Sequence, residues 1–305
     1  MTAARDVLIT GAGGFVGSAL AEGFLALGWR VTAVDRTFDA ATSARLSGSC
    51  QVTADLAHGD SSDLPAATVV VHAAAVTTEA ATLGWTPAAH IAANTRPLLA
   101  MLEHAARTRP DAFVFVSSSG VFAAGDGDGV LTDADVPTGR SPYAAAKRAG
   151  ELLTRAALEG IAAAHVIRLG YLYGPHETTR PSRSRTSAVA RWLAAARAGQ
   201  PLAVPSDDPP RDWTFTTDLA PAVARLVALR PPDHPVHLCS PFIVKDSAMA
   251  ARIAVHVPGA VWVTEPAAAP AKPPMRPSDL SRLGYLRWTE PDAALAQLAA
   301  TQGIA

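Results

Sequence analysis

The stretch TGAGGFVG, residues 10–17, decides the fold class of this chain. It follows an apolar run, Asp6–Thr10, and leads into the alanine- and leucine-rich segment Gly17–Leu27, so the pattern predicts a strand, a tight turn and a helix. Glycine permits such a turn and lets the backbone approach a pyrophosphate at the helix N-terminus, where free N–H groups favour an anion. The three glycines that we expect to hold a dinucleotide are Gly11, Gly14 and Gly17.

Beyond the turn, apolar runs alternate with helical segments up to about residue 170. Strands are predicted at Arg30–Asp35, Thr68–His72, Ala112–Ser117 and Ala163–Leu169, and helices at Arg96–Thr108 and from Ser141 to about Glu159. The strands lack a clear in-and-out alternation, which is typical of a parallel sheet covered on both faces. We therefore expect an α/β fold, with a Rossmann-type doubly wound parallel sheet in a domain spanning residues 1–170.

The chain changes character after Gly174 and Pro175. Residues 176–187 are polar and rich in arginine, a helix is predicted at Val189–Ala198, and proline is dense further on. Loops of this length commonly carry function. We expect residues 171–305 to form mostly a smaller substrate-binding region, with residues 211–230 returning to the first domain.

Composition excludes several classes of protein. The 305 residues carry a formal net charge of −1, which gives no bulk attraction to nucleic acid or to an anionic membrane. The apolar run at the N-terminus is too short for a signal peptide, and no stretch approaches ~18 uninterrupted apolar residues. The two cysteines, Cys50 and Cys239, resemble neither a disulfide framework nor a metal site. A cytoplasmic protein without a metal is the expectation.

An acidic residue ends the second predicted strand. Asp35 lies 18 residues beyond Gly17, where a carboxylate can bind the 2′-hydroxyl of an adenine ribose and repel a 2′-phosphate. This favours NAD over NADP. Arg36 follows directly, and an arginine there can accept a phosphate, so the choice between the two dinucleotides stays open at this stage.

The segment SPYAAAK, residues 141–147, reads as the start of a helix with Ser141 as N-cap. Tyr143 and Lys147 are four residues apart, which puts both on one face with about 5–6 Å between their Cβ atoms. The pair is either an acid/base site or only an aromatic ring over a lysine stem.

Further motifs follow in a fixed order along the chain. They are HAAA (72–75), SSSGVF (117–122), SPYAAAK (141–147), RLGYLYGP (168–175) and RDWTFTTDLA (211–220). With the glycine turn, they resemble an extended short-chain dehydrogenase/reductase of the NAD-dependent epimerase/dehydratase family over nearly the whole chain. The resemblance implies a catalytic triad of Ser118, Tyr143 and Lys147 beside the nicotinamide, with Tyr143 as general acid/base. A free tyrosine has a pKa near ~10, so a neighbouring cation and the helix N-terminus are expected to favour its phenolate.

The resemblance also implies which residues contact the NAD cofactor. They are Gly11, Gly14, Phe15, Val16, Gly17, Asp35, Arg36, Asp55, Leu56, Ala73, Ala74, Ala75, Asn94, Tyr143 and Lys147. Asn94 is expected in a supporting network; the alternative is an ordinary helix residue.

The substrate side is predicted to suit an anionic small molecule. Arg180, Arg183 and Arg185 lie close together on one loop, and the alternative interpretation is that this is only a solvated basic loop. The resemblance implies that arginines matching Arg211 and Arg276 grip a diphosphate, for which a guanidinium is suited. The residues predicted to bind substrate are Ser119, Tyr171, Arg180, Arg183, Arg185, Arg211 and Arg276.

Three positions depart from the family pattern. Ser119 and Gly120 stand where the dehydratase branch has an Asp-Glu pair, so a 4,6-dehydratase is not favoured. Tyr171 replaces an asparagine that helps to hold a sugar nucleotide. Val121-Phe122-Ala123 replaces a Val-Tyr-Gly run.

The leading hypothesis is an NAD-dependent epimerase that oxidises a sugar or nucleotide-sugar hydroxyl transiently and returns the hydride. The alternative is an NAD-dependent dehydrogenase or reductase of a small polar or carboxylate-bearing alcohol or sugar. A catalytically silent NAD(H)-sensing protein is a third reading. The family's dimeric four-helix bundle implies a homodimer through the helices around residues 96–108 and 142–159.

Overall fold

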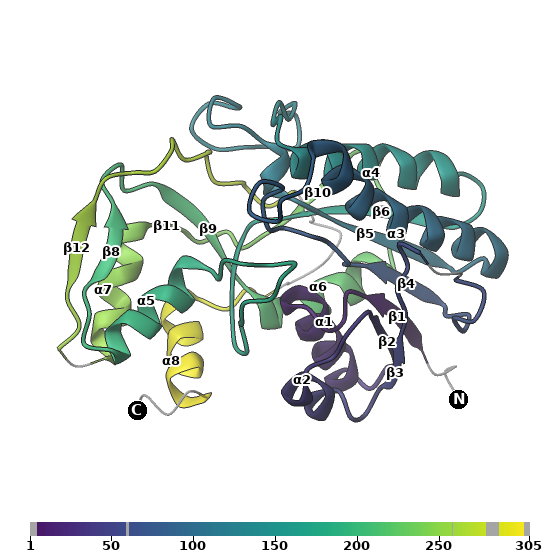
Figure 1. Cartoon of the computed structure of the whole chain (residues 1–305), viewed down its shortest axis with the longest axis horizontal. Coiled ribbons are helices and arrows are strands. Elements are labelled where there is room, and N and C mark those ends of the chain that lie inside the picture. Colours follow the sequence, from purple (N-terminus) through teal and green to yellow (C-terminus); the bar gives the residue numbers. More distant parts are fainter. Residues whose placement is uncertain (1–4, 59–60, 258, 279–286, 302–305) are drawn as a thin grey trace.

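A computed structural model describes residues 5–58, 61–257, 259–278 and 287–301. Figure 1 shows two regions side by side. One is built around a large sheet and contains the N-terminal half of the chain; the other is smaller and contains most of the C-terminal third. Among the described residues, no helix is both long and apolar enough to cross a membrane.

The large sheet is parallel throughout, and the order of its seven strands is β10-β6-β5-β4-β1-β2-β3. The strands are β1 (Asp6–Thr10), β2 (Arg30–Asp35), β3 (Cys50–Thr53), β4 (Val69–His72), β5 (Ala112–Ser118), β6 (Ala163–Leu169) and β10 (Val236–Leu238). The order runs outward in both directions from β1 and β4, so the predicted doubly wound Rossmann-type sheet is confirmed.

Helices cover both faces of this sheet. They are α1 (Phe15–Ala26), α2 (Ala40–Arg45), α3 (Pro87–Thr108), α4 (Pro142–Leu158) and α6 (Leu219–Leu226). Phe24 of α1 and Leu219 of α6 share a core with Val7 and Ile9 of β1. Leu8 lies between Val7 and Ile9 in the sequence, and it packs on the other face of the sheet with residues of α3 and α4. Alternate side chains of one buried strand thus enter two different cores, which explains the uninterrupted apolar run.

The smaller region contains a three-stranded sheet in the order β11-β9-β7 and a pair β12-β8. Its elements are β7 (Tyr171–Tyr173), α5 (Ala188–Arg197), β8 (Leu202–Pro205), β9 (Pro210–Phe215), β11 (Ile243–Lys245), α7 (Asp246–His256), β12 (Trp262–Glu265) and α8 (Pro291–Thr301). Trp192 and Trp213 are buried in its core, and their indole N–H groups donate to the carbonyls of Ala203 and Val244. These tryptophans therefore pack beneath the surface.

Several boundaries differ from the predicted ones. The helix expected at residues 96–108 begins at Pro87, nine residues earlier, and contains Pro97 in its interior. The proline-rich stretch before Arg211 holds β8 and the start of β9. Within residues 211–230, β9 belongs to the small sheet, whereas α6 joins the core of the large one. The domain division at residue 170 stays a prediction.

Helices α3 and α4 pack against each other on one face of the large sheet (Figure 1). Leu99 and Leu152, one on each helix, are 45% and 70% exposed. These are the helices through which the family resemblance implies pairing, and the homodimer stays a prediction.

Candidate active site

The glycine turn connects β1 to α1 and has no room for side chains at Gly11, Gly13 and Gly17. Gly11 has a φ of 72°, and an added Cβ there would lie 2.6 Å from the Cα of Ala74. At Gly17 an added Cβ would lie 2.0 Å from the carbonyl oxygen of Gly11. Gly14 is the N-cap of α1 and supplies no side-chain cap to its first amides. These amides and the helix dipole suit a pyrophosphate, so the turn fits the predicted cofactor.

Asp35 lies at the end of β2, next to the turn. Its Oδ2 accepts a hydrogen bond from the Gly13 amide at 2.9 Å, and its Oδ1 accepts one from the Thr37 amide at 3.3 Å. The two bonds orient the carboxylate beside the glycine turn. Arg36 is exposed, and its side chain makes no hydrogen bond or ion pair within the described ranges.

Two further segments predicted to contact the cofactor lie at the same edge of the sheet. The amide of Ala73 donates to the Thr10 carbonyl at 3.2 Å, which joins the segment after β4 to the glycine turn. Asn94 holds that segment from α3: its Oδ1 accepts from the Val76 amide at 2.9 Å, and its Nδ2 donates to the Val76 carbonyl at 3.1 Å. Asn94 therefore acts in a structural network.

The loop after β3 contains one exposed and one buried residue among those predicted to contact the cofactor. Leu56 is buried in the core under α3, whereas the Oδ1 of Asp55 accepts a bond from the Ala57 amide at 3.0 Å.

Ser118 and Tyr143 approach each other around a glycine. Ser118 is the last residue of β5, and its Oγ accepts a hydrogen bond from the Gly120 amide at 2.9 Å. An added Cβ at Gly120 would lie 3.1 Å from Cε1 of Tyr143 and 3.2 Å from Oγ of Ser118. Tyr143 is in the first turn of α4, where Ser141 accepts a bond from the Ala144 amide at 3.1 Å. The predicted helix cap thus places Tyr143 beside Ser118.

Lys147 is one turn further along α4 and is 4% exposed. Its Nζ donates to the Val116 carbonyl at 2.7 Å and lies 5.8 Å from the centroid of the Tyr143 ring. Burial lowers the pKa of Lys147 to about 8, although the nearby Glu151 carboxylate opposes this shift. The ammonium group is therefore held by the strand that ends in Ser118.

The electrostatics of Tyr143 differ from the sequence-based expectation. Burial raises the pKa of Tyr143 above its ordinary value, and two groups act in the opposite direction: the Ser118 hydroxyl and the positive charge of Arg183. Arg183, predicted to bind substrate, lies with its guanidinium 4.9 Å from the Phe15 ring and forms an ion pair with Glu177. The cation that lowers the tyrosine pKa is thus on a loop of the smaller region.

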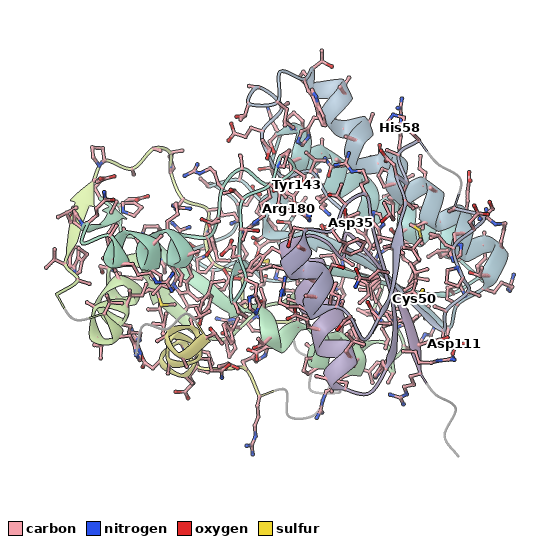
Figure 2. All side chains as sticks on the ribbon, turned by 60° about the horizontal axis from the view of Figure 1, so that its bottom comes forward. Asp35, Cys50, His58, Asp111, Tyr143 and Arg180 are labelled. Carbon is pink, nitrogen blue, oxygen red and sulfur yellow. The ribbon has the colours of Figure 1, made fainter. Side chains whose placement is uncertain are left out.

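The other two arginines predicted to bind substrate on the loop of residues 176–187 lie in different environments. Arg180 donates to the carbonyls of Gly13 and Thr37, the latter at 3.1 Å, so its side chain lies on the glycine turn. In the view of Figure 2, Arg180 lies next to Tyr143, with Asp35 to the right of both. Arg185 is exposed and makes no hydrogen bond or ion pair with the described residues.

A cationic cluster surrounds Tyr171. Arg211 pairs bidentately with Asp246 at 2.6 and 2.7 Å, and its guanidinium carbon is 4.4 Å from the centroid of the Tyr171 ring. The Nζ of Lys272 is 3.7 Å from the same centroid. Arg276 is exposed, and its amide donates to the Leu131 carbonyl at 2.8 Å.

Sequence reasoning missed two residues near these groups. Glu151 is four residues after Lys147 on the same helix face, and it accepts a hydrogen bond from Ser117 at 2.6 Å. Lys272 is one of three lysines in the chain, the others being Lys147 and Lys245. The i, i+4 spacing of Glu151 and the rarity of lysine were the signals available.

A dinucleotide turn on a doubly wound sheet, with a tyrosine and a lysine one helical turn apart beside it, defines an enzyme of the short-chain dehydrogenase type. The model of the NAD dependent epimerase/dehydratase family matches residues 7–237, so the chain belongs to that family. It is an NAD-dependent enzyme of the extended type, and NAD is its cofactor. No curated protein matches the sequence.

Solved structures with the same fold are distant in sequence. UDP-glucuronic acid 4-epimerase from Bacillus cereus, solved with UDP-glucuronic acid and NAD, is 19% identical with a TM-score of 0.80, covering 97% of this chain and 98% of that one. UDP-glucose 4-epimerase from Thermotoga maritima is 18% identical with a TM-score of 0.81, covering 98% and 99%. The NAD-dependent NDP-hexosamine 5,6-dehydratase TunA, involved in tunicamycin biosynthesis, is 20% identical with a TM-score of 0.82, covering 98% of both.

Proposed function

We propose that this enzyme is an epimerase that inverts a hydroxyl-bearing carbon of a sugar, carried as a nucleotide sugar. The observation that carries the proposal is the convergence of Ser118 and Tyr143 around Gly120, with Lys147 one turn along the same helix. The family and the fold are those of enzymes that act on such substrates, among them two 4-epimerases.

The residues of the chain divide the acid/base work. When bound, NAD supplies a site for the hydride that leaves the sugar carbon and returns to its opposite face. Tyr143 takes the proton of the sugar hydroxyl and gives it back as the hydride returns, so no atom is gained or lost. Ser118 orients the same hydroxyl. Lys147 and Arg183 place positive charge near the phenol, and the charge of Arg183, like the Ser118 hydroxyl, opposes the rise that burial causes in the pKa of Tyr143.

The cluster at Tyr171 supports an anionic substrate. Asp246 fixes the guanidinium of Arg211 with two hydrogen bonds, so one donor edge is pre-oriented and little side-chain entropy is lost on binding an anion. Lys272 adds a second cation on the Tyr171 ring. We assign the diphosphate of the nucleotide sugar to Arg211 and Lys272, while Tyr171 supplies an aromatic wall between them.

Elimination of water is not part of the proposal. Ser119 and Gly120 occupy the positions of the acid/base pair found in the dehydratase branch, and Ser119 is 4% exposed. Gly120 carries no side chain, and the contacts around its Cα leave little space for one. These two positions supply no carboxyl group to protonate a leaving hydroxyl.

A second candidate is a net dehydrogenase or reductase of a smaller, carboxylate-bearing alcohol or sugar. Tyr171 favours it, because a bulky ring with two cations fills the position where the family has an asparagine for the sugar nucleotide. Both candidates use the same triad and differ in whether the hydride returns to the substrate.

The experiment that separates them uses the purified protein with its bound cofactor. Nucleotide sugars and sugar acids are added singly, absorbance at 340 nm reports net reduction of NAD, and chromatography of the products reports an epimer. An epimer formed without lasting absorbance at 340 nm supports the proposal. Stoichiometric NADH with an oxidised product would establish the second candidate instead.

A further inference from the structure

The tip of the loop of residues 176–187 is a short hairpin. Arg180 and Arg183 exchange two backbone hydrogen bonds, at 2.9 and 2.8 Å, and Pro181 and Ser182 form the two-residue connection. The side chains of the two residues that close the hairpin contact different segments: Arg180 reaches the glycine turn, and Arg183 lies over Phe15. We call residues 176–187 the strap.

A buried carboxylate, that of Glu177, joins the two ends of the strap by hydrogen bonds. The side chain of Glu177 is 1% exposed and accepts bonds from Arg183, from the Ser187 amide at 2.7 Å and from the Ser187 hydroxyl at 2.6 Å. Ser187 is in turn the N-cap of α5. The two ends of the strap are therefore connected to helix α5 of the smaller region.

The middle of the strap is fastened to the large sheet. The amides of Thr77 and Thr78 donate to the Ser182 carbonyl at 2.8 and 3.1 Å. The Thr78 hydroxyl donates to the Pro181 carbonyl at 2.8 Å and accepts from the Ser184 amide at 2.8 Å. Thr77 and Thr78 directly follow the segment 73–76, which Asn94 holds in place.

The third fastening is Arg180. Its guanidinium donates to the carbonyls of Gly13 and Thr37 and lies 3.9 Å from Asp39, with the side chain 17% exposed. Gly13 belongs to the glycine turn, and Thr37 to the loop after β2. These are the two loops whose amides orient Asp35.

The strap thus contacts three of the segments predicted to hold the dinucleotide: the glycine turn, the loop after β2 and the segment after β4. We infer that Arg180 is a cofactor-retaining residue, which pins the strap across the adenosine half of bound NAD and slows its release. Arg180 acts by positioning the strap, through two backbone carbonyls, and takes no part in proton transfer. Retention serves the proposed epimerase, since that reaction regenerates NAD at each turnover.

The test measures release of NAD in the absence of substrate. Wild-type protein and variants are loaded with radiolabelled NAD, passed through gel filtration and chased with excess unlabelled NAD, and the retained label is followed over time. In Arg180→Ala we expect release to accelerate about tenfold or more, because hydrogen bonds from a charged group are lost. Arg180→Lys retains a donor and is expected to fall between the two.

Two further variants make the result specific. Thr78→Val keeps the volume of a buried side chain but removes its two hydrogen bonds to the strap, so it should also accelerate release. Arg185→Ala removes an equal charge from the same strap at an exposed position and should release NAD at the wild-type rate. Thermal unfolding of each unloaded variant verifies that it is folded.

A wild-type release rate in Arg180→Ala would overturn the inference, whatever the rate in Thr78→Val. Equal acceleration in Arg185→Ala would overturn it as well, since loop charge rather than the pinning contact would then control release. The inference rests on the dinucleotide site proposed above, but its readout needs no turnover. Net reduction of NAD by a substrate would refute the epimerase and leave the release rates as they are.

Discussion

Glu151 and Arg168 form a bidentate ion pair inside the protein, with Nε–Oε1 and Nη2–Oε2 distances of 2.9 and 2.8 Å. Their side chains are 10% and 5% exposed. Glu151 also accepts the Ser117 hydroxyl, so one carboxylate joins α4 to both β5 and β6. Because α4 carries Tyr143 and Lys147 and β5 ends in Ser118, this carboxylate helps to hold the helix of Tyr143 and Lys147 against the strand of Ser118.

Replacing Glu151 by alanine should destabilise the protein strongly, because Arg168 then remains buried without a partner. The expected loss in free energy of unfolding is about 3–5 kcal/mol. Urea unfolding followed by circular dichroism measures it. The double variant Glu151→Leu with Arg168→Met removes both charges and should recover much of the loss. A loss below about 1 kcal/mol in the single variant would contradict a tightly coupled pair.

Replacing Tyr143 by phenylalanine should abolish turnover while NAD is still retained through gel filtration. The change removes the hydroxyl that we propose carries the proton and keeps the ring that packs against Gly120. Product formation and bound NAD are measured on the same preparation. Activity near the wild-type level would show that another group moves the proton.

Replacing Asp35 by asparagine should shift the cofactor preference toward NADP. The carboxylate lies beside the glycine turn with both oxygens oriented by backbone amides, so it would repel a 2′-phosphate. We expect the ratio of the two dissociation constants to change about tenfold or more, since like-charge repulsion amounts to several kcal/mol in such contacts. Calorimetric titration with NAD and NADP measures the ratio, and an unchanged ratio would argue against this role.

Acid should destabilise the fold partly through buried histidines. His165 on β6 is fully buried, and burial lowers its pKa from 6.5 to about 4. Between these values the unfolded chain binds a proton that the folded chain does not, so stability falls as pH decreases through this window.

The histidine contribution can be isolated by comparing His165→Leu with the wild type. Below pH 6.5 the wild type should lose about 1.4 kcal/mol per pH unit more than the variant, until the pH approaches about 4. Free energies of unfolding measured in urea at several pH values give this difference. Parallel pH dependences for the two proteins would show that His165 titrates alike in both states.

The central sheet was predictable because its strands are short, apolar and separated by unambiguous turns. Asp6–Thr10, Arg30–Asp35 and Ala163–Leu169 have the predicted bounds. The start of α3 could not be predicted, because proline is typical of a first helical turn whereas Pro97 lies in the interior of this helix. The two strands that flank β9, namely β7 and β11, escaped detection because each contains three residues and takes its stability from tertiary packing.

The candidate site, too, was predictable from the sequence only in part. The local spacing of Tyr143 and Lys147 was readable from the sequence, because helix geometry alone brings them together. The position of Arg180 was not, since its contacts with Gly13 and Thr37 join residues more than 140 positions apart. No local pattern distinguishes an arginine that reaches the glycine turn from Arg185, which stays in solvent.

The return of β10 to the edge of β6 sets an order on folding at the ribosome. Residues 170–235 must be synthesised before this last strand is available, and α6, which shares a core with α1, emerges within the same interval. Until then the nascent sheet has an open edge and a partly bare face, the features that attract chaperones or neighbouring chains. The large sheet therefore completes its core only after the whole strap has been translated.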